Sequence, residues 1–361
     1  MRKLLAVAAV ATAGLVAAAC GPPPGPVGTT TTTAPGDLPV APRIATAPIG
    51  AQGHAALVAV QGMGAPRYFA STDTWHRELD VSDPADLAVM AAAAHQVDAD
   101  GRWVRSSGVD FENHWLEICD SVAAITCTKI PGSDMFNRAT FSPDGALLVG
   151  VHQPLDAPPT LRIFDATTFE AIVEVTRDSI DAGLLSGVWR PDSGAIAVVL
   201  DGELYTLVAE SGAEPQLVTG QDESTWPVLR QAGFVVGWTD DDRIVSGWAE
   251  ANYSTWPPTG SRFVLEAVDP DGTDRRDLGP VGTAGYGTLA PNGAVVWPAA
   301  ADVIGINGPA SVPHAHFDAD GAAPEALSTP WSETGPDGLL AAQVNVVGFV
   351  PRASVGAPSA P

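Results

Sequence analysis

Aromatic rings and carboxylates are interleaved in three short segments, the arrangement in this chain best suited to holding a ligand. The segments span residues 221–227, 248–256 and 285–287. An aromatic ring can stack on the apolar face of a sugar while a carboxylate accepts hydrogen bonds from the hydroxyls, and the same combination can hold a cation. The alternative is that the tryptophans pack between structural elements or over loop backbone. The candidate ligand-binding residues are Trp226, Trp248, Tyr253, Trp256, Tyr286, Asp222, Glu223 and Glu250.

Sequence motifs of catalysis are missing. No Gly-x-Ser-x-Gly elbow, Walker loop or His-Glu-x-x-His motif occurs. With 42 Asp and Glu residues in the chain, no single carboxylate pair marks an acid–base site. We therefore assign no catalytic residue. The alternative is a hydrolase or lyase of envelope glycans, with Asp222, Glu223 and Glu250 as its candidate acids.

One histidine pair has the spacing of metal ligands. His314-Ala315-His316 precedes Asp318 and Asp320, and alternate residues of a strand share one face. However, Asp318-Ala319-Asp320-Gly321 occupies the place that Asp269-Pro270-Asp271-Gly272 occupies in the preceding repeat, so these aspartates read as turn residues. We therefore predict neither a metal site nor a cofactor.

A turn motif that returns about every 48 residues sets the elements that must position the aromatic segments. Its copies combine Pro, Asp or Asn with Gly, which suit the corners of a tight turn, including one with positive φ. The clear copies are Ser142-Pro143-Asp144-Gly145, Arg190-Pro191-Asp192-Ser193-Gly194, Thr239-Asp240-Asp241-Asp242, Ala290-Pro291-Asn292-Gly293 and Gly335-Pro336-Asp337-Gly338; weaker ones are Asp98-Ala99-Asp100-Gly101 and Gly50-Ala51-Gln52-Gly53. Such repeats indicate an array whose units share a core with their neighbours.

Each repeat reads as four short strands. An apolar residue precedes the turn and an apolar run follows it, and two further strands complete the unit, as in 161–165 and 170–175. No long helical period is found. This pattern predicts an all-β fold, a β-propeller of four-stranded antiparallel blades. Seven copies of the turn favour seven blades over six, with one blade closed by strands from both chain ends.

The same topology places the aromatic segments together. In a propeller, the loops between second and third strands and the links between blades lie on the face opposite the Asp-Gly turns. All three aromatic segments belong to these connections, so they are expected to converge on one rim.

The repeated turn, the apolar strand after it and the strand end Phe164-Asp165 resemble WD-repeat-like propellers, particularly TolB-like domains. The resemblance covers roughly residues 45–350 and implies the fold but no chemistry. TolB-like propellers have six blades, whereas seven turns occur here. The chain also lacks the α/β domain that precedes the propeller in TolB, so a TolB-type role is not carried over.

The N-terminus resembles a bacterial lipoprotein signal. Arg2 and Lys3 precede an apolar stretch of 16 residues, shorter than the ~20 of a membrane span. The residues Ala17-Ala18-Ala19-Cys20 are similar to a lipobox, although Ala17 stands where Leu is usual. This resemblance implies cleavage before Cys20 and a diacylglycerol on its thiol. The alternative is an ordinary signal peptide cleaved after Ala19.

The expected organisation follows from these segments. Residues 1–19 form the signal peptide, and 20–44 hold the lipidated Cys20 and a Pro/Thr-rich linker. Residues 45–350 form the propeller, and 351–361 a disordered tail. The protein is therefore expected on the outer face of the bacterial cytoplasmic membrane, held by its lipid.

The other two cysteines fall on neighbouring strands of one repeat. Cys119 and Cys127 are expected to face each other across a hairpin, where an oxidising compartment would allow a disulfide. Two buried free thiols are the alternative. No histidine lies at a spacing that would make either cysteine catalytic.

The charge balance excludes some classes of partner. The formal net charge is −24, and loss of Arg2 and Lys3 with the signal makes it −26. Such acidity opposes binding to nucleic acid and to anionic lipid, so membrane attachment rests on the lipid anchor. Cationic groups are attracted instead. We therefore expect an envelope-anchored propeller that binds a protein or glycan partner and has no chemistry of its own.

Overall fold

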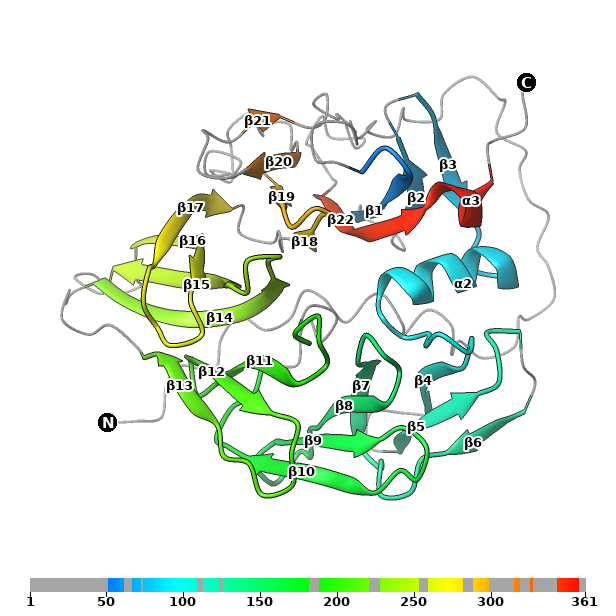
Figure 1. Ribbon diagram of the computed structural model, residues 1–361, viewed down its shortest axis with the longest axis horizontal. Helices are drawn as coiled ribbons and strands as arrows, with labels where there is room; N and C mark the ends of the chain where they lie inside the picture. The colour runs from blue at the N-terminus through cyan, green and yellow to red at the C-terminus, as the bar shows by residue number, and fades with distance from the viewer. Residues whose placement is uncertain are drawn as a thin grey trace.

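A computed structural model of the chain describes residues 51–61, 67–72, 74–108, 113–123, 126–181, 188–220, 228–252, 259–281, 288–298, 315–318, 325–326 and 343–356. Within these residues the strands form six small antiparallel sheets, numbered here in chain order. Figure 1 shows the sheets following one another around a ring, with the first strand of each nearest the centre. The fold is therefore an all-β propeller, as the repeats predict.

The first three sheets come mainly from the N-terminal half. Sheet 1 joins β22 (Gln343–Pro351), β1 (His54–Gln61), β2 (Arg67–Ser71) and β3 (His76–Leu79). Sheet 2 contains β4 (Trp103–Gly108), β5 (His114–Cys119) and β6 (Cys127–Lys129). Sheet 3 contains β7 (Phe136–Phe141), β8 (Leu147–His152), β9 (Thr160–Asp165) and β10 (Ala171–Thr176).

The other three sheets follow along the chain. Sheet 4 contains β11 (Ala195–Leu200), β12 (Glu203–Val208) and β13 (Gln216–Thr219). Sheet 5 contains β14 (Val228–Trp238), β15 (Ile244–Asn252), β16 (Thr259–Val268) and β17 (Arg276–Val281). Sheet 6 contains β18 (Thr288–Leu289), β19 (Val295–Pro298), β20 (Ala315–Asp318) and β21 (Glu325–Ala326).

Sheets 2 and 4 each keep a remnant of a fourth, innermost strand. Val97 bridges Trp103 beside β4, and Trp189 bridges Ile196 beside β11. Each bridge stands just before a copy of the turn motif, where the sequence predicts the first strand of a unit. Sheets 1, 3, 5 and 6 therefore have the predicted four strands, and in sheets 2 and 4 the first strand is reduced to a single bridged residue.

Both ends of the chain build sheet 1. Strand β22 pairs with β1 along its length, from His54 opposite Pro351 to Gln61 opposite Gln343. The expected closure by both chain ends is therefore observed. The preference for seven blades is wrong in the described part of the chain, which holds fewer sheets. The last turn copy, 335–338, lies outside the described residues, and the strand after it, β22, pairs with β1 instead of starting a further sheet.

The predicted end of the propeller at residue 350 is wrong. Residues 351–356, predicted to belong to a disordered tail, include the end of β22 and the short helix α3 (Arg352–Val355). Val355 is buried, and its carbonyl accepts a hydrogen bond from Arg77 on β3. These residues are therefore part of the closure of the ring.

A helix that the sequence did not predict lies between sheets 1 and 2. Helix α2 (Pro84–Ala93) begins with Asp83 as its N-cap, whose side chain accepts from the Ala85 amide. Asp86 is buried and binds Arg77 through two hydrogen bonds of 2.6 and 3.0 Å. Its alanines form no strong apolar stripe, which is why the periodicity did not show it. Neither α2 nor α3 is long and apolar enough to cross a membrane.

The turn motif performs the predicted backbone role. Gly145 has φ +72° and Gly293 has φ +81°, while Ser193 and Asp242 take the same positive-φ position at +64° and +66°. In the first copy the Ser142 hydroxyl donates to Asp144, and the Asp144 carboxylate accepts from the Ala146 amide. Side-chain acceptors of this kind replace missing backbone partners in a tight turn.

Tryptophans at the inner edges of two sheets join them to their neighbours. Trp189 is the bridged residue beside β11 in sheet 4, and Trp238 is the last residue of β14 in sheet 5. The indole of Trp189 donates to the Thr140 carbonyl of sheet 3, and that of Trp238 donates to the Val188 carbonyl of sheet 4. Both side chains are buried in one apolar core that extends over sheets 3, 4 and 5. Each indole thus combines apolar packing with a hydrogen bond that fixes the spacing between sheets.

Trp238→Phe is expected to lower the free energy of unfolding by about 2 kcal/mol, because it removes the 2.9 Å indole hydrogen bond and leaves space in the core. Trp189→Phe is the matched control and should cost less, since its indole bond is longer at 3.4 Å. Urea unfolding followed by circular dichroism measures both. Equal effects of the two substitutions would argue against the hydrogen bond as the cause.

The two cysteines occupy directly opposed positions on β5 and β6, and the structure joins them in a disulfide. Reduction is expected to lower stability by about 2–3 kcal/mol, the effect of a short loop closure. The Cys119→Ala/Cys127→Ala variant should have the lower stability and be insensitive to reductant. Thiol titration of the native protein provides the direct check: two reactive thiols would contradict the bond.

Candidate ligand-binding site

The antiparallel strands sort their connections onto two faces of the ring. We call the face with the repeated turns the turn face. The opposite face, with the connections between second and third strands and between sheets, is called the link face. The three aromatic segments fall into link-face connections as predicted: 221–227 joins β13 to β14, 253–258 joins β15 to β16 and 282–287 joins β17 to β18.

Most of the predicted site residues lie outside the described residues. Trp226, Asp222 and Glu223 belong to the first connection, Tyr253 and Trp256 to the second, and Tyr286 to the third. The structure therefore describes the strands that carry these connections but not the aromatic side chains themselves. Trp248 and Glu250, both on β15, are the two predicted residues that it does describe.

The prediction that Trp248 belongs to an exposed rim is wrong. Its residue is 1% exposed and lies in the core shared by sheets 3, 4 and 5. Its indole donates to the Ser246 hydroxyl two residues earlier on the same face of β15. Ring burial and a satisfied N–H are the packing role that was the alternative to ligand binding.

Glu250 is part of a charged cluster built across sheet 5. Arg230 on β14 lies opposite Glu250 in the strand register, with 3.5 Å between Arg230 Nε and Glu250 Oε1. The Arg230 guanidinium also donates to Glu266 on β16 at 2.6 Å. Below it, the Trp248 ring lies 4.7 Å from the guanidinium carbon. One arginine thus joins three strands and is supported by an aromatic face.

Glu266 is the most buried member of this cluster, at 4% exposed. Its second carboxylate oxygen lies 3.9 Å from Arg275, whose guanidinium donates to Thr219 on sheet 4. The two carboxylates and two guanidiniums balance in charge, which a buried ionic group requires. Neither Arg230 nor Glu266 attracted notice in the sequence, because only the register of three strands brings them together.

A simpler form of this arrangement recurs around the ring. In three other sheets an arginine binds a glutamate on the adjacent strand and lies over an aromatic ring at 5.0–5.5 Å. The sets are Arg67–Glu78 with Phe69, Arg105–Glu117 with Trp103, and Arg162–Glu174 with Phe136. In sheets 1 and 3 these side chains stand toward the link-face ends of their strands, as do Arg230 and Glu250 in sheet 5, whereas Glu266 lies near the turn-face end of β16. The described framework beneath the link face is therefore cross-linked by paired charges.

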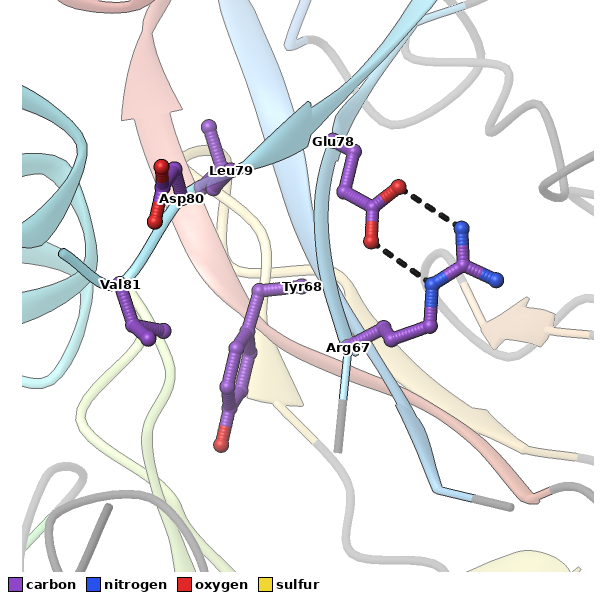
Figure 2. Close-up of a pocket in the computed structure, with 6 residues that line it drawn as sticks. All are labelled: Arg67, Tyr68, Glu78, Leu79, Asp80 and Val81. Atoms are coloured by element: carbon purple, nitrogen blue, oxygen red, sulfur yellow. Dashed lines mark hydrogen bonds and ion pairs between the residues drawn. The ribbon is translucent and has the colours of Figure 1, made fainter. Parts of the chain in front are cut away.

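A pocket of about 430 Å³ opens beside the pair in sheet 1. Figure 2 shows Arg67 and Glu78 joined on one side, Asp80 and Val81 on the other, and Tyr68 between them. The Arg67–Glu78 contact is bidentate, with both bonds 2.7 Å long. Burial raises the pKa of Tyr68 to about 12, so its phenol stays protonated at neutral pH.

Titratable groups elsewhere serve turns and packing. The Arg190 side chain and the Gly194 amide hold the pKa of Asp192 at about 2, and the Ser142 hydroxyl lowers the pKa of Asp144, so these turn-face carboxylates stay ionised. Burial and the Arg162 charge lower the pKa of His152, which stacks on Phe136 with ring centroids 5.5 Å apart. Among the described residues, no cluster of three metal-ligating side chains occurs.

No protein-family model and no curated protein matches the chain. Similar solved structures include a putative TolB from Agrobacterium tumefaciens, at 15% identity and TM-score 0.41, covering 82% of this chain and 99% of that one.

Two further similar structures carry names of enzymes. An oligogalacturonate lyase in complex with manganese is 14% identical, with TM-score 0.43, and the match covers 68% of this chain and 69% of the other. A putative 6-phosphogluconolactonase from Bacteroides uniformis is 11% identical, with TM-score 0.43, covering 83% and 100%. At these identities and TM-scores none of the three carries an argument about function, and the fold rests on the strand pairing described above.

Removing the central cation of the sheet 5 cluster is expected to be costly. Arg230→Met leaves Glu266 buried without its 2.6 Å partner, and breaking such a pair costs about 3 kcal/mol or more. Arg162→Met is the matched control: its partner Glu174 has a 52% exposed side chain, so losing that pair should cost no more than about 1 kcal/mol. Urea unfolding of the two variants tests this, and a smaller loss for Arg230→Met than for Arg162→Met would contradict it.

Proposed function

We propose that this protein is a lipid-anchored β-propeller outside the cytoplasm that binds a glycan or protein of the cell envelope at its link face. The observation that carries the proposal is the charged and aromatic framework on which the link-face connections stand. Arg230 lies near the start of β14, just after the first aromatic connection. Glu250 lies near the end of β15, just before the second. Paired charges across three strands give those connections fixed ends, which favours binding by a preorganised surface.

The residues proposed to contact the ligand are the aromatic and acidic side chains of these connections. They are Trp226, Tyr253, Trp256, Tyr286, Asp222 and Glu223. Aromatic faces beside carboxylates suit a sugar ring or a cationic group of a protein partner. Trp248 has no part in this surface because it is buried. Glu250 is proposed as a supporting residue, since Arg230 holds it at the end of β15.

Membrane attachment is proposed through Cys20. The stretch that ends at this cysteine resembles a lipoprotein signal, and the Pro/Thr-rich residues after it suit an extended spacer. The disulfide between Cys119 and Cys127 supports an oxidising compartment, because such bonds are rare in the cytosol. The excess of 42 acidic over 18 basic residues leaves the lipid as the means of attachment.

Affinity capture from solubilised cell envelope tests the proposal. The lipidated protein is compared with Trp226→Ala/Trp256→Ala, and Trp115→Ala serves as a matched control from sheet 2. We expect a defined glycan or protein to be retained by the native protein and the control, and lost from the double variant, because the two aromatic side chains form the contact surface.

Other outcomes are informative in opposite directions. Equal retention by all three proteins would show that the aromatic connections only support the fold. Retention of nothing, together with release of soluble sugar from the envelope fraction, would favour the hydrolase or lyase alternative. In that case Asp222 and Glu223 become the first residues to replace.

A further inference from the structure

The pocket in sheet 1 is a second place where the described residues could hold a ligand, and it does not depend on the aromatic connections. It lies between the start of β2 and the end of β3, which are the outer strands of sheet 1. Both strand ends belong to the link face. Its volume of about 430 Å³ falls at the small end of ligand pockets, which run from about 300 to 1,000 Å³.

The charges that line the pocket disfavour a fully charged ligand. An anion attracted to Arg67 would meet Glu78, which already grips the guanidinium through two bonds, and the nearby Asp80. Hydrogen bonds from Ser82 lower the pKa of Asp80, so its repulsion persists at neutral pH. A cation would find both oxygens of Glu78 already bound to Arg67 and one oxygen of Asp80 already bound by Ser82, so the carboxylates of the wall are largely committed. The wall is therefore better matched to a neutral group that both donates and accepts.

The remaining lining is apolar or aromatic. Val81 is 41% exposed, unusual for a large apolar side chain here, and Leu79 lies beside it. Tyr68 and Leu79 line the pocket but are only 2% and 4% exposed, so Val81 supplies its accessible apolar surface. Apolar C–H surface on one side and hydroxyls on the other describe a sugar ring.

We propose that this pocket binds one uncharged pyranose unit, with Arg67 donating to and Glu78 and Asp80 accepting from its hydroxyls while Val81 covers its apolar face. The ring size fits the volume, and each polar wall residue meets a hydroxyl rather than a charge. None of the residues of the proposed aromatic surface lines this pocket.

The test is saturation-transfer NMR and calorimetry on the full-length lipidated protein, in a detergent without a sugar headgroup. The probes are the methyl glycosides of glucose, galactose and mannose, with methyl glucuronide as the anionic and glucosamine as the cationic comparison. At least one neutral glycoside is expected to bind, and both charged sugars to bind less well. Glu78→Gln should weaken binding about tenfold, because an acceptor for a hydroxyl becomes a mixed amide and the grip on Arg67 loosens.

Two further variants make the result specific. Glu174→Gln is the matched control, since Arg162–Glu174 repeats the same ion pair over an aromatic ring in sheet 3. It should bind as the native protein does. Val81→Trp fills the exposed apolar wall without touching the ion pair and should abolish binding while thermal unfolding stays unchanged.

The proposal is overturned if no neutral glycoside binds, if a charged sugar binds better, or if Glu78→Gln and Val81→Trp both bind like the native protein. Trp226→Ala/Trp256→Ala separates this site from the proposed function. If that variant loses the glycoside while Glu78→Gln keeps it, the sugar binds at the aromatic connections and the pocket inference fails alone. If it keeps the glycoside but releases the envelope partner, the two sites are independent.

Discussion

The pairing of β22 with β1 is the contact on which the rest of the structure depends. A sheet of three or four short strands cannot cover both of its own faces, so each sheet here is buried only by its two neighbours in the ring. An open array would leave sheets 1 and 6 with one face in water. Eight register pairs between the two ends of the chain remove that exposure, and Arg77 adds a bond from β3 to the carbonyl of Val355 after β22. Helix α2 lies between sheets 1 and 2, where its buried Asp86 is held by Arg77 of β3.

The closure of the ring by β22 and β1 separates the features that the sequence predicted correctly from the one that it did not. The turns could be predicted because their interactions are local. Within four residues, Asp144 accepts a backbone hydrogen bond and Gly145 adopts the positive φ that the turn requires, and equivalent residues in other copies do the same. The opposed cysteines were readable for the same reason, since one short hairpin places Cys119 against Cys127. The number of sheets in the described part of the chain was not readable, because counting turns assigns one unit to each copy. The strand that follows the last copy, β22, instead completes sheet 1 through a pairing between residues almost 300 positions apart.

The burial of single side chains in the candidate site could not be predicted from the sequence either. Trp248 looked like a surface aromatic because it stands next to Glu250 and close to Tyr253 in the sequence. Strand β15 is the second strand of its sheet, however, so every other side chain of the strand turns toward the neighbouring sheet, and Trp248 is one of these. Glu266 was passed over as one acid among 42, yet it is almost completely buried against Arg230. Strand register decides whether a carboxylate faces solvent or pairs with a buried arginine, and that register exists only once the strands have paired.

The pairing of arginines inside the sheets also bears on what the protein can bind. Arginine suits these positions because its planar group can donate hydrogen bonds to a carboxylate from its edge while its face lies on an aromatic ring. Arg67, Arg105, Arg162 and Arg230 each pair with a glutamate and lie over an aromatic ring, and Arg67 binds both oxygens of its partner, so these four of the 18 basic residues are neutralised within the fold. The excess of 42 acidic over 18 basic residues then sets the charge of the protein. An anionic polymer meets repulsion from such a charge, whereas hydroxyl groups meet fixed donors and acceptors whose orientation is already set. In the proposed pocket, the rigid Arg67–Glu78 pair, rather than the net charge, would then supply the selectivity for a neutral sugar.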